Sequence, residues 1–285
     1  MKDVSNAMRA RILTAAVPYI KQYTDQYVVV KYGGNAMIDE ELKKSVMKDL
    51  LLLQLVGVKV VLVHGGGPAI NRTLDAMQIE SHFANGLRVT DEATMDVVQM
   101  VLAGKVNKGL VADLTDLGGK AIGLCGVDGN MIQVHKQNEE LGYVGSVDAI
   151  DTSIIHDVIS RGYIPVISSI GMGADGKTYN INADTVAAKI AGALKAETMV
   201  AMTNIDGVLK DVHDPESLIS KITVAEAEQL KADGIIAGGM IPKVDCCLEA
   251  IEAGAQKVFI INGEIPHAIL IELLTDEGLG TMFVA

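Results

Sequence analysis

The chain has 285 residues, which is long enough for one large α/β domain or for two lobes of ordinary size. Hydrophobic residues make up 49% of the chain and tryptophan is absent, a composition that suits a helix-covered sheet built from aliphatic side chains. The formal net charge of −12, without a basic stripe, argues against nucleic acid and anionic membranes as partners, so any bound anion must be held by particular lysines, arginines and backbone N–H groups.

Helix and strand patterns alternate in the N-terminal part of the chain. Residues 8–22 carry apolar side chains at helical spacing, and Pro18 inside that pattern predicts a kink. Residues 27–31 predict a short buried strand, and Asp39 is a suitable N-cap for the helix pattern that follows. Residues 58–63 predict a second strand, again followed by a helix pattern. This alternation predicts an open, mainly parallel sheet flanked by helices, with right-handed crossovers.

The remainder of the chain continues this pattern. Further strands are expected at residues 121–124, 164–170, 198–202 and 258–261, with a polar-tipped excursion at 132–135 and 143–147. Helices are expected from residue 183 to 194 and at 223–233 and 240–254. The glycine-rich stretch at 171–179 is the expected border between two lobes.

Cysteine usage and the lack of long apolar segments predict a cytoplasmic protein. The three cysteines, Cys125, Cys246 and Cys247, show neither a disulfide framework nor zinc spacing, so we expect reduced thiols and no metal site. We expect no signal peptide, because the first residues lack a continuous apolar core. Residues 50–63 are too short and too interrupted to span a bilayer, so we expect no membrane segment.

Two glycine-rich turns each follow an expected strand and precede a helix pattern. They are KYGGN at residues 31–35 and HGGGP at residues 64–68. Glycines let the backbone approach an anion, and a helix N-terminus supplies free N–H donors. One such turn is as readily a tight turn without a ligand, but two on neighbouring strands favour an anion site at the carboxyl edge of the sheet.

A formal phosphate-loop pattern also occurs, from Gly171 through Gly176 and Lys177 to Thr178. That motif needs a helix that begins at the lysine, whereas the helix pattern here begins only near residue 183. We interpret this match as accidental and residues 175–177 as a surface turn. Neither glycine-rich turn has the GxGxxG spacing, so a dinucleotide fold has little support.

Three charged residues stand where a charge needs a partner. Lys31 ends an apolar strand, where a lysine is costly without an anion nearby. Lys243 stands in the first turn of an expected helix, where a cation opposes the helix dipole. Asp184 opens another helix, where dipole stabilisation alone would explain it. His64, at a strand end, is interpreted as a buried structural histidine.

Six blocks resemble the amino-acid kinase family: VVVKYGGNAM, VHGGGPAI, NGLRVTD, YNINAD, TNIDGVL and GGMIPK, in that order. They cover essentially the whole chain and are most similar to members that phosphorylate N-acetyl-L-glutamate. The resemblance implies the two-lobed amino-acid kinase fold. It also implies transfer of the γ-phosphate of ATP, with Mg²⁺ carried by the nucleotide, to the side-chain carboxylate of N-acetyl-L-glutamate in arginine biosynthesis. Such a carboxylate, with a pKa of roughly 4, needs no general base.

The resemblance further implies a role for each matching residue. The catalytic residues would be Lys31, Lys243 and Asp184. The contacts to the acyl substrate would be Gly66, Gly67, Arg88 and Asn180. The contacts to the nucleotide would be Gly33, Gly34, Thr203, Asn204, Asp206 and Gly207.

The N-terminal helix and the block HAILIELLTDEGLGTM resemble the arginine-inhibited members of the family. The resemblance implies that arginine binds at Tyr19, His267, Glu277 and Gly280.

The same resemblance implies that three segments of the chain have different functions. Residues 1–25 would form the kinked helix that joins dimers into a hexamer, a trimer of dimers. Residues 26–178 would form an N-lobe that binds the acyl substrate and dimerises, and residues 179–285 a C-lobe that binds the nucleotide. The alternative for the first 22 residues is an apolar helix packed on its own domain.

Three other functions stay open at this level. They are a sister kinase acting on aminoadipate, aspartate or carbamate, a non-catalytic amino-acid sensor, and a phosphate-loop ATPase that uses Lys177. The block NGLRVT at residues 85–90 favours N-acetyl-L-glutamate over the other acceptors. The joint presence of Lys31, Lys243 and Asp184 speaks against a sensor.

Overall fold

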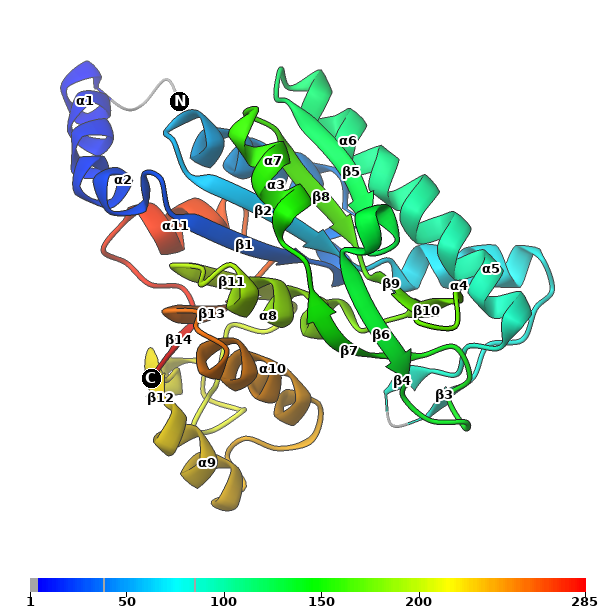
Figure 1. Ribbon diagram of the computed structural model, residues 1–285. Helices are drawn as coiled ribbons and strands as arrows, with labels where there is room; N and C mark the ends of the chain where they lie inside the picture. The colour runs from blue at the N-terminus through cyan, green and yellow to red at the C-terminus, as the bar shows by residue number, and fades with distance from the viewer. Residues whose placement is uncertain (1–4, 38, 85) are drawn as a thin grey trace.

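The computed structural model describes residues 5–37, 39–84 and 86–285. Its centre is an eight-stranded sheet among these residues, and all neighbouring strands run parallel except β13 and β14 (Figure 1). The strands, in spatial order, are β12 (Lys221–Thr223), β14 (Thr281–Val284), β13 (Lys257–Asn262), β11 (Thr198–Thr203), β1 (Tyr27–Tyr32), β2 (Lys59–His64), β8 (Ile164–Ser168) and β5 (Ala121–Cys125). The open, mainly parallel sheet predicted from the sequence is thus confirmed.

Alternation along the central strands creates two cores, one on each face of the sheet. In β1, Val29 faces one core, whereas Val28, Val30 and Tyr32 face the other. The core on the Val29 side is covered by α7 (Ser153–Ser160), α8 (Ala183–Ala193), α9 (Val224–Ala232) and α10 (Ile241–Glu252). The core on the Val28 side is covered by α2 (Val17–Tyr23), α3 (Glu40–Leu55), α6 (Asn107–Asp116) and α11 (Ala268–Leu274).

A smaller four-stranded sheet adjoins the large one, and its strands form a hairpin-rich layer. In spatial order they are β10 (Thr178–Asn180), β9 (Ile170–Gly173), β6 (Ile132–Lys136) and β7 (Gly145–Ile150). The single strand predicted at residues 164–170 was wrong, because the chain leaves the large sheet at Ser169 and continues in the small one. An uninterrupted apolar run carries no signal of such a change of sheet. The expected lobe border at residue 178 falls at the start of β10 and stays a prediction.

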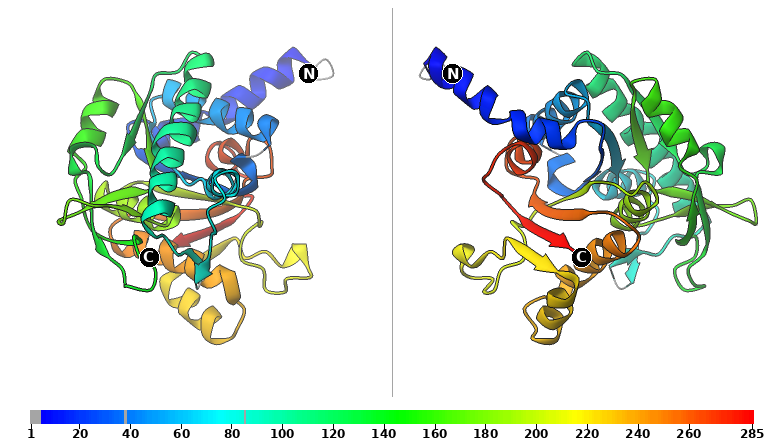
Figure 2. Two further views of the ribbon diagram at one scale, coloured as in Figure 1. Left: turned by 90° about the vertical axis from the view of Figure 1, so that its right-hand side faces the viewer. Right: turned by 60° about the vertical axis from the view of Figure 1, so that its left-hand side comes forward.

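The kink predicted at Pro18 is confirmed. The chain forms two helices, α1 (Asn6–Ala15) and α2, and Pro18 lies in the first turn of the second, where a missing N–H is tolerated. α2 packs on the Val28-side core through Tyr19, Ile20 and Tyr23, whereas α1 contains no buried residue. Figures 1 and 2 show α1 extending away from the rest of the chain.

The helices that lead into the site begin at well-formed caps or glycines. Asp39 caps α3 as predicted, since its Oδ1 accepts hydrogen bonds from the N–H groups of Glu41 and Leu42, both at 2.9 Å. α4 (Gly67–Ala76) begins directly after Gly66. A long helical segment then runs through α5 (Glu92–Gln99), the π-helix η2 (Met100–Val106) and α6. The short strands β3 (Phe83–Ala84) and β4 (Leu87–Arg88) lie between α4 and α5.

Candidate active site

The site lies at the carboxyl ends of the central strands, where the two glycine turns leave the sheet. Tyr32 at the end of β1 is in register with His64 at the end of β2, which in turn is in register with Ser168 of β8. Parallel strands therefore deliver both turns to one edge. The sheet order explains this placement, because β1 and β2 are direct neighbours at its centre.

Lys31 has the anionic partner that its position requires. Its Nζ lies 3.0 Å from Oδ1 of Asp184, which is in the first turn of α8. The lysine is only 8% exposed, so this carboxylate is its counterion in a buried position. Asn182 caps α8 and accepts a hydrogen bond from the Asp184 N–H at 2.8 Å, which fixes the start of the helix. A Cβ at Gly33 would lie 3.3 Å from the Lys31 Nζ, so glycine at this turn leaves the ammonium group uncovered on that side.

Asp184 and Lys243 line one cavity of about 480 Å³, named here the Asp184 cavity. Lys243 lies in the first turn of α10, which packs beside α8. Asp184 therefore links the two lysines, since it pairs with Lys31 and lines the same cavity as Lys243. Thr203, at the end of β11, lines a narrow extension of this region together with the same aspartate and lysine.

A second cavity of about 180 Å³, the Arg88 cavity, adjoins the first and shares Asn182 with it. Its wall includes Gly66, Gly67, Arg88 and Asn180, the four residues predicted to contact the acyl substrate. The backbone N–H groups at the start of α4 are available at this turn, because the first N–H groups of a helix have no partner within it.

Arg88 is held by neutral groups. Its Nη1 donates to Ser81 Oγ and its Nη2 donates to Asn71 Oδ1 at 2.6 Å, and the guanidinium lies 4.6 Å from the centre of the Phe83 ring. Burial lowers the pKa of Arg88. Within the described residues, no carboxylate lies at ion-pair distance from it, so its charge is available to an anionic ligand in the cavity.

Two polar side chains that line the Arg88 cavity were not predicted as site residues. Asn182 lines both cavities, and Ser169, which is 2% exposed, lines the Arg88 cavity at the point where β8 ends. Asn182 could have been found from its N-cap pattern ahead of Asp184. Nothing in the local sequence distinguishes Ser169, because its position depends on the chain leaving one sheet for the other.

The residues after β11 that are predicted to contact the nucleotide form a loop, which is constrained by a hydrogen bond and by a close backbone approach. Asn262 Nδ2 donates to Asp206 Oδ1 at 2.8 Å, which ties the loop to the end of β13. Gly207 has a φ of 150°, and a Cβ there would lie 2.5 Å from Thr281 Oγ1. Asn204 and Gly34 lie in the turns after β11 and β1, which are neighbouring strands. The contact of these residues with a nucleotide stays a prediction.

His64 has the structural role predicted for it. It is fully buried, its Nδ1 lies 2.8 Å from the carbonyl oxygen of Gly65, and its Nε2 lies 3.1 Å from Asn107 Nδ2. The carbonyl can only accept and the amide nitrogen can only donate, so the ring is the neutral tautomer with its proton on Nδ1. Burial lowers the pKa of His64 to about 4, which keeps it neutral at pH 7.

The phosphate-loop match is a surface turn, as the sequence indicated. β9 and β10 form an antiparallel hairpin, and no helix begins at Lys177. The Lys177 Nζ lies 3.1 Å from the Tyr143 hydroxyl. The backbone N–H of Lys177 donates a hydrogen bond to Asp175 Oδ1 at 3.1 Å. The glycines of this pattern therefore form a hairpin rather than a phosphate cradle.

Two of the residues predicted to bind arginine, Tyr19 and His267, lie on the other face of the sheet from Asp184. Tyr19 packs on the Val28-side core, and His267 Nδ1 lies 2.6 Å from Oδ1 of the buried Asp49. Glu277 is exposed. Gly280 has a structural reason to be glycine, because a Cβ there would lie 2.0 Å from the carbonyl oxygen of Ile260.

The cysteines are free thiols. Burial raises the pKa of Cys246, which lines the Asp184 cavity, to about 11, and burial raises the pKa of Cys247 well above its usual value. Both are therefore protonated thiols at neutral pH. Among the described residues, no group of three or more His, Cys, Asp or Glu side chains could hold a metal ion, and no helix is long and apolar enough to cross a membrane.

Residues 26–262 match the amino acid kinase family, and the chain belongs to this family. It is similar to curated acetylglutamate kinases over nearly its full length. It is 53% identical to the acetylglutamate kinase of Brachyspira hyodysenteriae, and the match covers 99% of both chains. It is 50% identical to the acetylglutamate kinase of Heliobacterium modesticaldum, and the match covers 96% of this chain and 97% of the relative. Among solved structures, it superposes with a TM-score of 0.84 on N-acetylglutamate synthase from Neisseria gonorrhoeae in complex with coenzyme A and N-acetyl-glutamate. That chain is 27% identical, and the match covers 97% of this chain and 63% of the synthase.

Proposed function

We propose that this chain transfers the γ-phosphate of ATP to the side-chain carboxylate of N-acetyl-L-glutamate, forming N-acetyl-L-glutamyl 5-phosphate and ADP in arginine biosynthesis. The observation that carries the proposal is the Lys31–Asp184 ion pair, whose aspartate lines, together with Lys243, a cavity that adjoins the Arg88 cavity. The similarity to acetylglutamate kinases of the same length supports this choice of acceptor.

The reaction needs charge stabilisation rather than a base. The acceptor carboxylate is ionised at neutral pH, since its pKa is roughly 4, and one of its oxygens attacks the γ-phosphorus directly. The bond between that phosphorus and the bridging oxygen breaks, and its electron pair stays on ADP. Lys31 and Lys243 offset the negative charge on the transferring phosphoryl oxygens, and Asp184 positions the Lys31 ammonium. A magnesium ion carried on the phosphates of ATP would neutralise further charge.

We assign substrate recognition to the two cavities. Arg88 receives the α-carboxylate of the acyl substrate with two parallel N–H donors, and Asn180 supplies a second polar contact. Gly66 and Gly67 let the backbone approach the acyl substrate closely.

The nucleotide would lie on the C-lobe side of the same edge. Its contacts would be Gly33, Gly34, Thr203, Asn204, Asp206 and Gly207. In this division, residues 26–178 supply most contacts to the acyl substrate and residues 179–285 supply most contacts to ATP.

The proposal is tested by offering ATP and a panel of acceptors, with the acyl phosphate trapped as a hydroxamate. The panel contains N-acetyl-L-glutamate, aspartate, aminoadipate and carbamate. We expect product with N-acetyl-L-glutamate, and a loss in kcat of at least about 1,000-fold in Lys31→Ala. Lys177→Ala is the matched lysine control and should retain most activity. Equal losses in the two variants, or a preference for another acceptor, would contradict the proposal.

We also propose that α1 mediates self-association into a hexamer, a trimer of dimers, in a cytoplasmic enzyme inhibited by arginine. The support is an exposed apolar surface on a helix without buried residues: Ile12 is 60% exposed and Leu13 is 73% exposed. Tyr19, His267, Glu277 and Gly280 would form the arginine site beside α2.

Deletion of residues 1–15 tests this part, because it leaves α2 and its buried Tyr23 in place. We expect a smaller particle in sedimentation and a loss of arginine sensitivity. A full-size assembly with unchanged inhibition would rule out this role of α1.

A further inference from the structure

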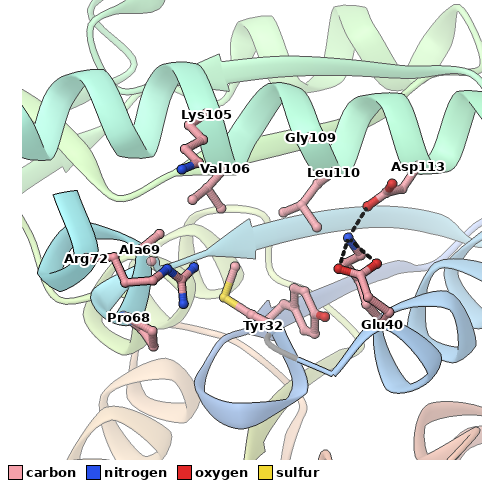
Figure 3. A pocket seen from close by; sticks show the side chains of 13 residues that line it. Tyr32, Glu40, Pro68, Ala69, Arg72, Lys105, Val106, Gly109, Leu110 and Asp113 are labelled. Atoms are coloured by element: carbon pink, nitrogen blue, oxygen red, sulfur yellow. Dashed lines mark hydrogen bonds and ion pairs between the residues drawn. The ribbon is translucent and has the colours of Figure 1, made fainter. Parts of the chain in front are cut away.

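A third cavity, of about 270 Å³, lies on the opposite side of β1 from Lys31 and is named here the Tyr32 cavity (Figure 3). Tyr32 directly follows Lys31 in β1, so their side chains point to opposite faces of the sheet. α3, α4, η2 and α6 surround this space. The proposed reaction uses none of its charged side chains.

The two ends of the Tyr32 cavity carry opposite charge. At one end are Arg72 of α4 and Lys105 of η2, and neither has a carboxylate at ion-pair distance within the described part of the chain. At the other end, Glu40 and Asp113 flank Lys43, with Nζ to oxygen distances of 2.9 and 3.3 Å. One ammonium between two carboxylates leaves one formal negative charge, against two positive charges at the opposite end. In Figure 3, Arg72 and Lys105 lie at one end of the cavity, and Glu40 and Asp113 lie at the other.

The middle of the cavity is neutral and largely apolar. Val106 and Leu110 face Tyr32 across it (Figure 3). The Tyr32 hydroxyl donates a hydrogen bond to the carbonyl oxygen of Ala36 at 2.5 Å. Burial, followed by the negative potential of Asp113 and Glu40, raises the pKa of Tyr32, so the phenol stays neutral. A ligand crossing this region would contact hydrocarbon and an aromatic ring.

We propose that the Tyr32 cavity binds a small dipolar molecule, with a carboxylate at Arg72 and Lys105, an amine or guanidinium beside the acidic end formed by Glu40 and Asp113, and a short hydrocarbon chain between the two. The volume lies near the lower limit of small-molecule pockets, roughly 300 Å³, which matches a ligand of amino-acid size. Each charged group of the ligand would lie beside the cavity end of opposite charge. A ligand with only one charged group would interact with only one of these ends.

The cavity is distinct from the Arg88 cavity but shares one wall with it. Gly66 lines both, and a Cβ at Gly66 would lie 2.6 Å from Leu102 Cδ2 of η2. The substrate turn thus packs directly against the element that also carries Lys105. This inference rests on the proposed function in one respect, the assignment of N-acetyl-L-glutamate to the Arg88 cavity. Because of that assignment, N-acetyl-L-glutamate should not compete with a ligand of the Tyr32 cavity.

Isothermal calorimetry with the whole chain tests the inference without an activity measurement. The probes are 4-aminobutanoate, 5-aminopentanoate, 6-aminohexanoate and lysine, with hexanoate and hexylamine as single-charge analogues. We expect saturable binding by members of the dipolar series and at least about tenfold weaker binding of either analogue. The binding should persist at saturating N-acetyl-L-glutamate.

The variants Arg72→Ala and Asp113→Asn should each weaken binding at least about tenfold, whereas Arg161→Ala, an exposed arginine away from the cavity, should not. Arg72 is exposed, so its truncation leaves the core intact. The inference fails if no dipolar probe binds, if the single-charge analogues bind equally well, or if Arg72→Ala behaves like Arg161→Ala. Complete displacement by N-acetyl-L-glutamate would place the probes in the Arg88 cavity and would also overturn it.

Discussion

The Lys31 ammonium lies 3.0 Å from the Asp184 carboxylate, and this pair joins the end of β1 to the first turn of α8. The lysine is 8% exposed, so its charge depends on the aspartate for a partner in a region with little solvent. Because the same aspartate lines the cavity that contains Lys243, it connects the two cations proposed to act on the phosphoryl group.

Asp184→Asn should lower kcat by about 100-fold with little change in fold. The amide keeps the shape of the side chain but cannot neutralise Lys31, so the ammonium is no longer positioned by an ion pair. Steady-state kinetics with circular dichroism as a check on folding measures the effect, and Asp233→Asn, on the exposed end of α9, is the matched control. Wild-type kcat in Asp184→Asn would exclude the positioning role.

Arg88→Lys should raise the KM for N-acetyl-L-glutamate by about tenfold or more and change kcat much less. Lysine keeps the charge but lacks the planar fork that Ser81 and Asn71 orient through the two terminal nitrogens. Initial rates across acyl-substrate concentrations at saturating ATP test this, with Arg161→Lys as the control. If the KM for ATP rises instead, Arg88 belongs to the nucleotide site.

The stability of the protein should depend on Asp49 in a defined pH window. Burial raises the pKa of Asp49 from 3.8 to about 6, so the folded state binds more protons than the unfolded chain between these values. The free energy of unfolding therefore falls as pH rises from about 4 to about 6, by up to about 3 kcal/mol from this group.

Asp49→Asn removes this titration, so wild type should lose stability relative to the variant across the same window. Urea unfolding at a series of pH values measures the difference, and Asp116→Asn, an exposed carboxylate on α6, serves as the control. A difference between wild type and Asp49→Asn that does not change with pH would contradict the assignment.

Gly280→Ala should destabilise the fold by about 2 kcal/mol or more, because the added methyl group would meet the backbone carbonyl of Ile260 at 2.0 Å. Backbone at a strand cannot move aside as a side-chain tip can. Gly278→Ala is the matched control, since its nearest neighbour, Glu272 Oε1, would lie 3.6 Å away. Thermal unfolding compares the two, and equal melting temperatures would show that the strand pair accommodates the methyl group.

Several elements followed directly from local sequence, and others did not. Asp39 as an N-cap and the break at Pro18 depend on chemistry within a few residues, and both are confirmed. The helical run over α5, η2 and α6 was not predicted. Its π-helix shifts the apolar face relative to a 3.6-residue period, and Gly104 and Gly109 interrupt the pattern further.

The sequence by itself determined the fold class, the two glycine turns and the need of Lys31 for an anion, because each depends on periodicity or on the cost of burying a charge. The resemblance implied that Asp184 acts with Lys31, and the tertiary structure gave their direct contact. Only the tertiary structure decided that Asn182 and Ser169 line the site, and that Tyr32 and Arg72 share a cavity behind the sheet. These contacts join elements far apart in the chain, and parallel strands with crossover helices bring them together in a way that no local pattern records.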